Sequence, residues 1–311
     1  MDYPHQPVMV NEVLKNLITS NEGIYVDGTA GSGGHSEAIG NMISPKGRLI
    51  CLDRDLDAIE IAQKRLDRLD TQVDLININY SQIGKALKDL GIDKISGVLL
   101  DLGMSSYQLD LSGRGFSFNR DEPLDMRMDL NTKTNARDLI NTLSPKEIEG
   151  ILRKFGEERR ARAIARTIER KRQKAPIETT RQLADLIHSV IPPSRRPGSK
   201  DPATRTFQAL RIAVNNELKG LSEFLETIPS IMERGGRLVI MSYHSLEDRI
   251  VKQTLAGWEK GCTCPPDLPR CACGNVSLFK RLNKKGIKPA DREVENNPRA
   301  RSATLRAAER I

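Results

Sequence analysis

The sequence has no long hydrophobic run, and this absence limits where the chain can work. None of its apolar stretches approaches the ~18 residues that a membrane-spanning helix needs. The first ten residues lack the basic and apolar blocks of a secretory signal. We therefore expect a cytoplasmic protein without a membrane partner. No internal repeat or low-complexity segment interrupts the sequence, so its length allows one large core and a smaller second one.

The chain is also poor in cysteine, and a cytoplasmic compartment would keep its five thiols reduced, which excludes a disulfide framework. Four of the cysteines form two closely spaced Cys-x-Cys pairs: Cys262, Cys264, Cys271 and Cys273. Four thiolates are enough for a closed structural zinc site, although this spacing is tighter than the usual C-x2-C. The sequence leaves a zinc site and a set of reduced loop thiols open, and catalysis is expected to depend on neither.

Positive charge exceeds negative charge, giving a formal net charge of +8. Such an excess suits a polyanionic partner but also an ordinary basic enzyme. Much of it gathers in one helical stretch and the loop that follows: Arg159, Arg160, Arg162, Arg166, Arg170, Lys171, Arg172, Lys174, Arg195, Arg196 and Lys200. This cluster is either a solvated face or a surface that binds RNA phosphates.

Short apolar runs alternate with helical patterns in the first third of the chain. The runs span residues 24–27, 48–53, 73–78 and 97–101, and three of them end in aspartate. Alternation of this kind predicts a parallel sheet with right-handed crossovers. The pattern resumes with a buried strand at 237–243, a helix capped by residues 245–248 and a weak last strand at 303–309.

Between these parts the alternation stops. A capping box at 144–147 opens a long helical pattern, and a further helix is predicted from 201 to about 228, ended by Gly235 and Gly236. We therefore predict an α/β fold in three stretches: residues 1–103 and 206–311 form the sheet domain, and 104–205 form an inserted helical domain.

A glycine loop follows the first strand and precedes a helix. Its glycines Gly31, Gly33 and Gly34 let backbone N–H groups approach a nucleotide-like ligand. Asp53 ends the second strand, where a carboxylate accepts hydrogen bonds from ribose hydroxyls. The loop fits the G-x-G-x-x-G fingerprint of nicotinamide enzymes only imperfectly. Asp27, directly before it, either holds loop N–H groups or favours the cationic amino-acid end of S-adenosylmethionine over a pyrophosphate.

Six segments in this order carry a family resemblance: VDGTAGSGGHS (26–36), DLGMSSYQLD (101–110), RGFSFNRDEPLDMRMD (114–129), FGEERRARAIA (155–165), SYHSLEDR (242–249) and NPRARSATLRAAE (297–309). Through them the chain resembles the ribosomal RNA small-subunit methyltransferase H family, also called MraW, over essentially its whole length. The resemblance implies a Rossmann-like, S-adenosylmethionine-dependent methyltransferase domain with the inserted helical domain recognising the substrate.

The implied reaction is methylation of the exocyclic N4 amine of a cytidine in the decoding region of 16S rRNA, within the small ribosomal subunit. The implied cofactor contacts are Gly33, Gly34, His35, Asp53, Tyr80, Asp101 and Gln108. Two alternatives are a non-catalytic RNA-binding assembly factor and, less favoured, a nicotinamide-dependent oxidoreductase. Monomer and homodimer both stay open.

In such a reaction the protein mainly aligns N4 with the methyl group. Hydrogen-bond acceptors aimed at the N4 hydrogens localise its lone pair, and Asp101, Ser105 and Ser106 are the catalytic candidates. No cysteine ends the strand of Asp101, so the nucleophile of a C5 methyltransferase is missing. Residues expected to bind the substrate, either by stacking on the base or by facing the RNA, are Arg114, Phe116, Phe118, Arg159, Arg160, Tyr243 and His244; each aromatic is otherwise a core residue.

Overall fold

The structure is a computed structural model, and it describes residues 7–194, 196, 199–262, 264 and 273–311. The chain folds into two compact units. One comprises Met1–Gly103 and Leu218–Ile311, and the other comprises Met104–Glu217. The first boundary is the expected one, whereas the second lies at residue 217 and not at 205.

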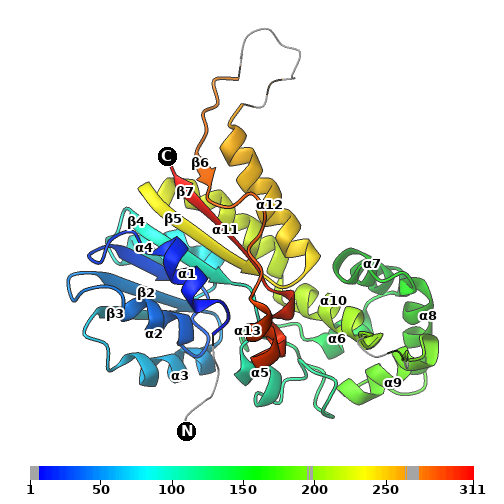
Figure 1. Cartoon of the computed structure of the whole chain (residues 1–311). Helices are drawn as coiled ribbons and strands as arrows, with labels where there is room; N and C mark the ends of the chain where they lie inside the picture. Colours follow the sequence, from blue (N-terminus) through cyan, green and yellow to red (C-terminus); the bar gives the residue numbers. More distant parts are fainter. Residues whose placement is uncertain (1–6, 195, 197–198, 263, 265–272) are drawn as a thin grey trace. The chain divides into compact units, whose positions relative to one another are not determined.

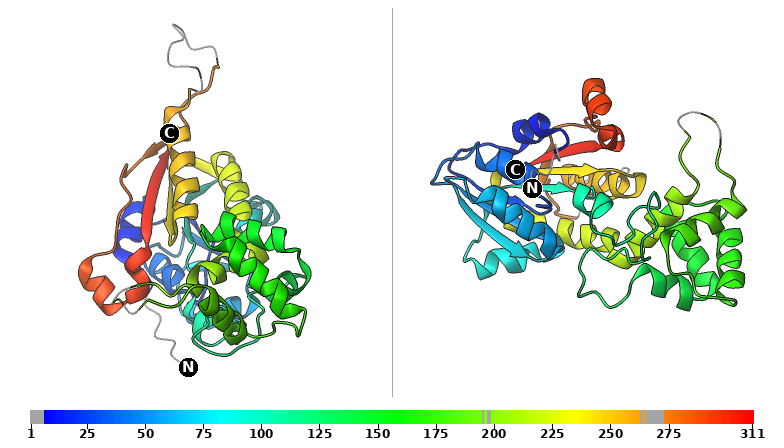
Figure 2. Two further views of the ribbon diagram at one scale, coloured as in Figure 1. Left: turned by 90° about the vertical axis from the view of Figure 1, so that its right-hand side faces the viewer. Right: turned by 90° about the horizontal axis from the view of Figure 1, so that it is seen from below.

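The first unit is built on a seven-stranded sheet with the order β3-β2-β1-β4-β5-β7-β6. Strands β1 to β5 are parallel, while β7 lies antiparallel between β5 and β6 (Figures 1 and 2). The expected parallel sheet is thus present, with an antiparallel end that the sequence did not predict. The strands are β1 (Ile24–Asp27), β2 (Arg48–Asp53), β3 (Gln72–Asn77), β4 (Ile95–Asp101), β5 (Met232–Ser242), β6 (Phe279–Arg281) and β7 (Thr304–Arg310).

Helices cover both faces of this sheet and bury one apolar cluster on each. On one face α4 (Ile83–Asp89), α11 (Glu217–Ile231) and α12 (Ser245–Lys260) pack around Ile83, Phe224 and Val251. On the other, α1 (Val10–Leu17), α2 (Gly34–Gly40) and α3 (Leu56–Leu66) pack around Val13 and Ile39. The unit also contains η1 (Tyr80–Gln82), α13 (Asp291–Asn296) and η2 (Pro298–Ser302).

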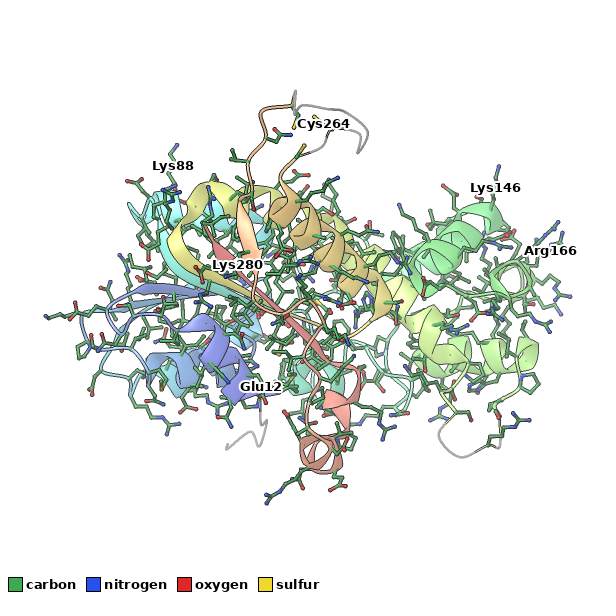
Figure 3. The ribbon with its side chains drawn as sticks, turned by 45° about the horizontal axis from the view of Figure 1, so that its top comes forward. Glu12, Lys88, Lys146, Arg166, Cys264 and Lys280 are labelled. Carbon is green, nitrogen blue, oxygen red and sulfur yellow. The ribbon has the colours of Figure 1, made fainter. Side chains whose placement is uncertain are left out.

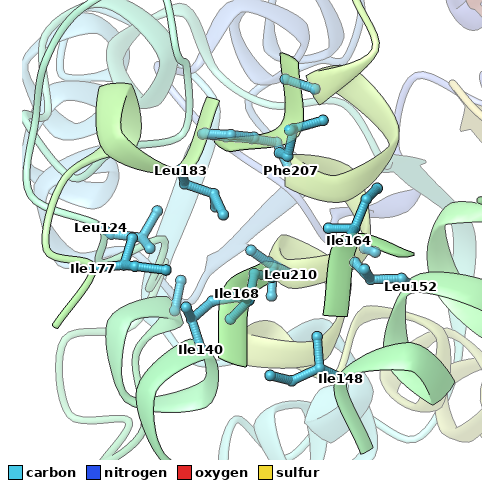
Figure 4. Packing of buried hydrophobic residues seen from close by; sticks show 14 of the residues in the cluster. Leu124, Ile140, Ile148, Leu152, Ile164, Ile168, Ile177, Leu183, Phe207 and Leu210 are labelled. Atoms are coloured by element: carbon cyan, nitrogen blue, oxygen red, sulfur yellow. The ribbon is translucent and has the colours of Figure 1, made fainter. Parts of the chain in front are cut away.

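The second unit is helical and has a core of its own. Its amphipathic helices turn their apolar stripes inward, where Leu152, Ile164, Ile168 and Leu210 meet (Figure 4). The helices are α5 (Ser106–Asp110), α6 (Ala136–Thr142), α7 (Pro145–Gly156), α8 (Ala161–Arg172), α9 (Thr180–Val190) and α10 (Ala203–Asn215). In the described parts of both units, none of the helices has the length and apolarity that a membrane crossing requires.

Three predictions about helix ends are wrong. The helix expected from 201 to about 228 is two helices, because Asn216 adopts a left-handed conformation (φ 50°) between α10 and α11. Helix α11 ends at Ile231, so Gly235 and Gly236 lie inside β5 and do not end it. The capping box of α12 begins one residue earlier than predicted, with His244 as the N-cap and Glu247 as its partner.

Candidate active site at the ends of the parallel strands

Three neighbouring parallel strands end in acids, Asp27 on β1, Asp53 on β2 and Asp101 on β4. Parallel strands bring their carboxyl ends to one edge of the sheet, where open α/β sheets bind ligands. Asp27 pairs with Cys51 and Leu99, so the strands of Asp53 and Asp101 continue two residues further than β1. The glycine loop occupies the space that the shorter strand leaves.

Hydrogen bonds fix this loop between the two longer strands. Gly31 N donates to Asp53 Oδ2 at 2.8 Å, and Asp101 N donates to Thr29 Oγ1 at 2.7 Å. Gly33 closes the loop with φ +81°, a conformation that disfavours other residues, and caps α2. The loop is therefore held at the strand ends before any ligand binds.

Asp27 holds the glycine loop through hydrogen bonds. Its side chain is fully buried, accepting hydrogen bonds from Ser36 Oγ at 2.6 Å and from Thr29 N at 3.1 Å. Burial raises the pKa of Asp27 above its ordinary value, although the hydrogen bonds from Ser36 and Thr29 act against it. Of the two roles the sequence left open, this geometry supports holding the loop and gives no path to direct contact with a cofactor.

Asp53 is partly exposed and organises the next turn. Its two carboxylate oxygens accept hydrogen bonds from Gly31 N and from Asp55 N, at 2.8 and 2.9 Å. Burial raises its pKa to about 6, against the effect of these two bonds. Each oxygen keeps a lone pair for a further donor, which is what contact with two ribose hydroxyls requires.

Asp101 is the most connected acid of the edge. His35 Nε2 lies 3.5 Å from its Oδ2, Gly103 N donates to its Oδ1 at 2.9 Å, and the Tyr243 hydroxyl also donates to it. Burial acts to raise the pKa of Asp101, but these partners outweigh it and lower the pKa below its ordinary value. The side chain is 19% exposed, so a fixed, ionised carboxylate faces the ligand edge.

The Tyr243 ring packs closely against the backbone at Gly103. A Cβ at Gly103 would lie 2.9 Å from the Tyr243 ring, so only glycine lets the ring pack against the backbone here. Burial and the negative charge of Asp101 raise the pKa of the Tyr243 hydroxyl well above its usual value, which keeps it a donor. Tyr243 was expected to stack on the substrate base; the structure shows it holding Asp101, a role that the sequence did not reveal.

His35 is the residue at this edge that is best suited to contact a ligand. The residue is only 6% exposed, yet neither ring nitrogen has a hydrogen-bond partner among the described residues. Its 3.5 Å approach to Asp101 is too long for a good hydrogen bond. Buried polar groups are nearly always paired. A bound molecule with polar groups at this edge would satisfy the ring, so the site fits an adenosine-type cofactor.

Tyr80 lies at the same edge but is 7% exposed. Its ring packs edge-on against Phe224, with centroids 5.8 Å apart, and a Cβ at Gly28 would lie 3.3 Å from the Tyr80 Cβ. The contact of Tyr80 with the cofactor, which the family resemblance implies, stays a prediction.

Three further predicted residues lie in the helical unit, at the start of α5. Ser105 is the N-cap, and its Oγ accepts a hydrogen bond from Gln108 N at 3.1 Å. Gln108 is buried at 7% exposure, and Ser106 opens the helix. The catalytic roles of Ser105 and Ser106 and the cofactor contact of Gln108 stay predictions.

Arg114, Phe116 and Phe118 make contacts inside the helical unit. Arg114 is 7% exposed and donates from Nη1 to the carbonyl of Met128 at 3.0 Å. Phe116 belongs to the buried core, and the ring of Phe118 packs against that of Phe207 at 5.0 Å. Phe118 is partly buried against this core. Binding of the substrate by these three residues stays a prediction.

His244 has a structural role as the N-cap of α12. As the N-cap of α12 its Nδ1 accepts from Glu247 N, and its Nε2 lies 3.1 Å from Glu247 Oε1. With 10% of its side chain exposed, it shapes the turn after β5. A capping histidine had no sequence signal, since Ser, Thr, Asp and Asn are the usual N-caps.

The described part of the predicted basic cluster lies on the helical unit, whereas Arg195 lies outside the described residues. Arg159 and Arg160 are exposed before α8, and Arg166 projects outward from its solvent face (Figure 3). Arg166 and Arg170 line a groove of about 700 Å³ together with Thr167 and Ser189. Within the described residues, neither Arg166 nor Arg170 has an acidic partner at ion-pair distance. The cations are thus available to an anionic ligand.

The cysteine segment is described in part. The thiols of Cys262, Cys264 and Cys273 lie together, whereas Cys271 lies outside the described residues.

A doubly covered sheet of this strand order, with a glycine turn and acids at its carboxyl edge, defines a Rossmann-like methyltransferase. The profile of the MraW methylase family matches residues 2–311, and the chain belongs to this family. It is 48% identical over 310 residues to the ribosomal RNA small subunit methyltransferase H of Geobacter sp. (strain M21), covering 100% of this chain and 99% of that protein. The protein of the same name from Ruminiclostridium cellulolyticum is 46% identical over 313 residues, covering all of both chains. None of these findings favours an oxidoreductase.

Proposed function

We propose that this chain transfers a methyl group from S-adenosylmethionine to the N4 amine of a cytidine in the decoding region of 16S rRNA. We further propose that it acts in the cytoplasm on rRNA within the small ribosomal subunit. The family and the names of the relatives support the reaction class. The observation that carries the proposal is Asp101, an ionised carboxylate held at the ligand edge by Gly103 and Tyr243, with His35 Nε2 3.5 Å away.

The residues around the glycine loop are those that would hold the cofactor. Asp53 offers two acceptor oxygens to ribose hydroxyls. Gly33 and Gly34 would contact the cofactor through their backbone, because Ala62 and Pro7 lie where their side chains would point. The unpaired nitrogens of His35 offer a polar contact in a buried position. When bound, S-adenosylmethionine supplies a methyl group that its sulfonium has already activated.

The chain's own task is to make N4 a better nucleophile and to orient it. The N4 lone pair is delocalised into the cytosine ring, and a carboxylate that accepts a hydrogen bond from N4 opposes this delocalisation. Asp101 suits this role because its lowered pKa keeps it ionised near neutral pH. The Tyr243 hydroxyl and Gly103 N–H hold the carboxylate in place, so little reorganisation is needed during the reaction.

The exposed cations of α8 support an RNA substrate. Arg166 and Arg170 line a groove in which Thr167 and Ser189 add hydroxyl groups, and these four side chains can bind phosphate oxygens. The one acid of the lining, Glu169, is paired with Arg172. We propose that this surface positions the RNA backbone and carries no sequence information.

The test is a methylation assay on purified small subunits that lack the modification, with the product nucleoside identified and mapped by mass spectrometry. For Asp101→Ala we expect N4-methylcytidine to fall at least ~100-fold, the scale of losing a fixed electrostatic contact in a transition state. For Tyr243→Phe, which keeps the ring, we expect kcat to fall about tenfold with KM unchanged.

The matched control is Asp70→Ala, which removes an exposed carboxylate outside the site and should leave kcat unchanged. Circular dichroism of each variant verifies folding. Wild-type methylation by the Asp101→Ala protein would remove the basis of the proposal, and a chain that binds small subunits without methylating them would be an assembly factor.

A further inference from the structure

One group of side chains is not used by the proposed reaction. The chain leaves α12 at Lys260 and returns to the sheet in β6 at Phe279, and the segment between carries the thiols of Cys262, Cys264 and Cys273. Figure 3 shows Cys264 where this segment projects from the end of α12. What brings the three thiols together is the base of this segment.

The base is closed by contacts between the end of α12 and the start of β6. Ser277 Oγ donates to the carbonyl of Glu259 at 2.8 Å, and the Arg281 guanidinium pairs with the Glu259 carboxylate. The rings of Trp258 and Phe279 stack with centroids 4.5 Å apart. The two ends of the segment, after Lys260 and before Phe279, therefore lie side by side.

A glycine allows the two strands to approach closely. Gly261 has φ +64°, and a Cβ there would lie 2.5 Å from the backbone of Val276. No other residue fits at this position without moving the chain. Cys262 follows this contact directly, and Cys273 comes shortly before Val276 on the returning strand. The backbone thus carries cysteines from both strands to one place.

The spacing of the thiols has a chemical meaning. The three sulfurs lie within 4.8 Å of one another, and the Cys262 and Cys273 sulfurs are 3.8 Å apart. In a tetrahedral zinc site with Zn–S bonds of about 2.3 Å, two thiolate sulfurs are about 3.8 Å apart. A disulfide requires about 2.05 Å. The observed distance excludes a disulfide and fits two ligands of one metal ion without any movement of the chain.

We propose that Cys262, Cys264 and Cys273 bind one zinc ion as thiolates, releasing their protons to solvent, and that the ion ties the end of α12 to the strand leading into β6. Sulfur ligands select zinc over magnesium or calcium, which prefer oxygen. The assignment rests on these three thiols, whose positions the structure gives. It is independent of the proposed methyl transfer, because none of the three is placed in the reaction.

The experiment measures metal in the full-length protein, expressed with added zinc and dialysed. We expect about one zinc per chain, and a fall to background in the double variant Cys262→Ser/Cys273→Ser. Replacing zinc by cobalt should produce a thiolate-to-cobalt charge-transfer band in the wild type. The control is Cys51→Ala: Cys51 is buried in β2, where burial raises its thiol pKa, and this variant should keep its zinc.

A second readout separates a structural zinc site from loose binding. Metal removal should increase proteolysis within residues 261–278 and lower the thermal midpoint, while methylation by the metal-free protein continues. The proposal fails if the wild type holds no zinc and gives no cobalt band, or if the double variant holds as much zinc as the wild type. If that variant aggregates, the cobalt titration of the wild type decides.

Discussion

At Asp53, folding and ligand binding make opposite demands on one carboxyl group. Burial raises its pKa to about 6, so the folded chain holds this proton more tightly than the unfolded chain does. Asp53 therefore favours folding less and less as the pH rises from about 4 to about 6. The ionised form, in contrast, is the one that accepts hydrogen bonds from ribose. The folded protein therefore disfavours the form of Asp53 that binds the ligand.

This difference predicts a pH dependence of cofactor affinity. Below pH 6 the protonated Asp53 loses acceptor capacity, so the Kd for S-adenosylmethionine should rise by up to about tenfold for each pH unit. Calorimetric titrations at several pH values between about 5 and 7.5 measure this change.

The control is Asp53→Asn, which cannot ionise. It should bind S-adenosylmethionine weakly and with an affinity that no longer changes over the same range. An Asp53→Asn protein that keeps the wild-type pH profile would show that another group, such as Asp27 with its raised pKa, is responsible.

Among the elements, the loop before α6 depends on a single side chain of α10. Asn215 is buried at 8% exposure; its Oδ1 accepts from Met128 N at 2.9 Å and its Nδ2 donates to the Met126 carbonyl at 2.7 Å. Met126 has φ +61°, a strained conformation for a residue other than glycine. The amide of Asn215 holds this strained turn against the helix.

Replacing Asn215 by Ala should therefore destabilise the protein strongly. Two buried backbone groups lose their partners, for which we expect about 2–4 kcal/mol in the free energy of unfolding. Urea denaturation followed by circular dichroism measures the change. Asn131→Ala, at an exposed position in the same loop region, should change it by less than about 0.5 kcal/mol. Equal effects of the two variants would contradict this account.

The elements also show how far the sequence can predict this structure. The strand bounds of β1 and β2 follow from short apolar runs that end in aspartate, because this signal is local. The N-cap His244 is a residue that is uncommon at this position, so no pattern predicts it. Asn216 is a residue that can end a helix in the left-handed conformation, but the helical pattern continues on both sides of it, so the break was not predicted. In the site, Asp53 was predictable from its spacing to Gly33. The bond from Tyr243 to Asp101 was not, since it joins segments that only the folded sheet brings together.

For the whole molecule, the net charge of +8 makes RNA affinity sensitive to salt. Phosphate contacts release counterions, so the slope of log K against log salt counts them. If Arg166 and Arg170 bind the backbone, Arg166→Glu/Arg170→Glu should reduce that slope by about two, one for each lost contact. Filter binding of 16S rRNA fragments at several salt concentrations measures it.

The matched control is a charge reversal outside the α8 groove. Lys88→Glu alters an exposed cation on α4, in the sheet unit (Figure 3), and should leave the slope nearly unchanged. If Lys88→Glu lowers the slope as much per charge as the α8 variant, the α8 groove has no special role.

The position of β7 at the end of the chain, as the partner of β5, makes the sheet complete only late in synthesis. A ribosome releases β5 well before β7, because α12, β6 and α13 all come between them. Until β7 emerges, the nascent chain exposes the full hydrogen-bonding edge of β5, the kind of edge that invites pairing with other chains. Translation that stalls in the last stretch would leave a sheet that holds its glycine loop yet is open to aggregation.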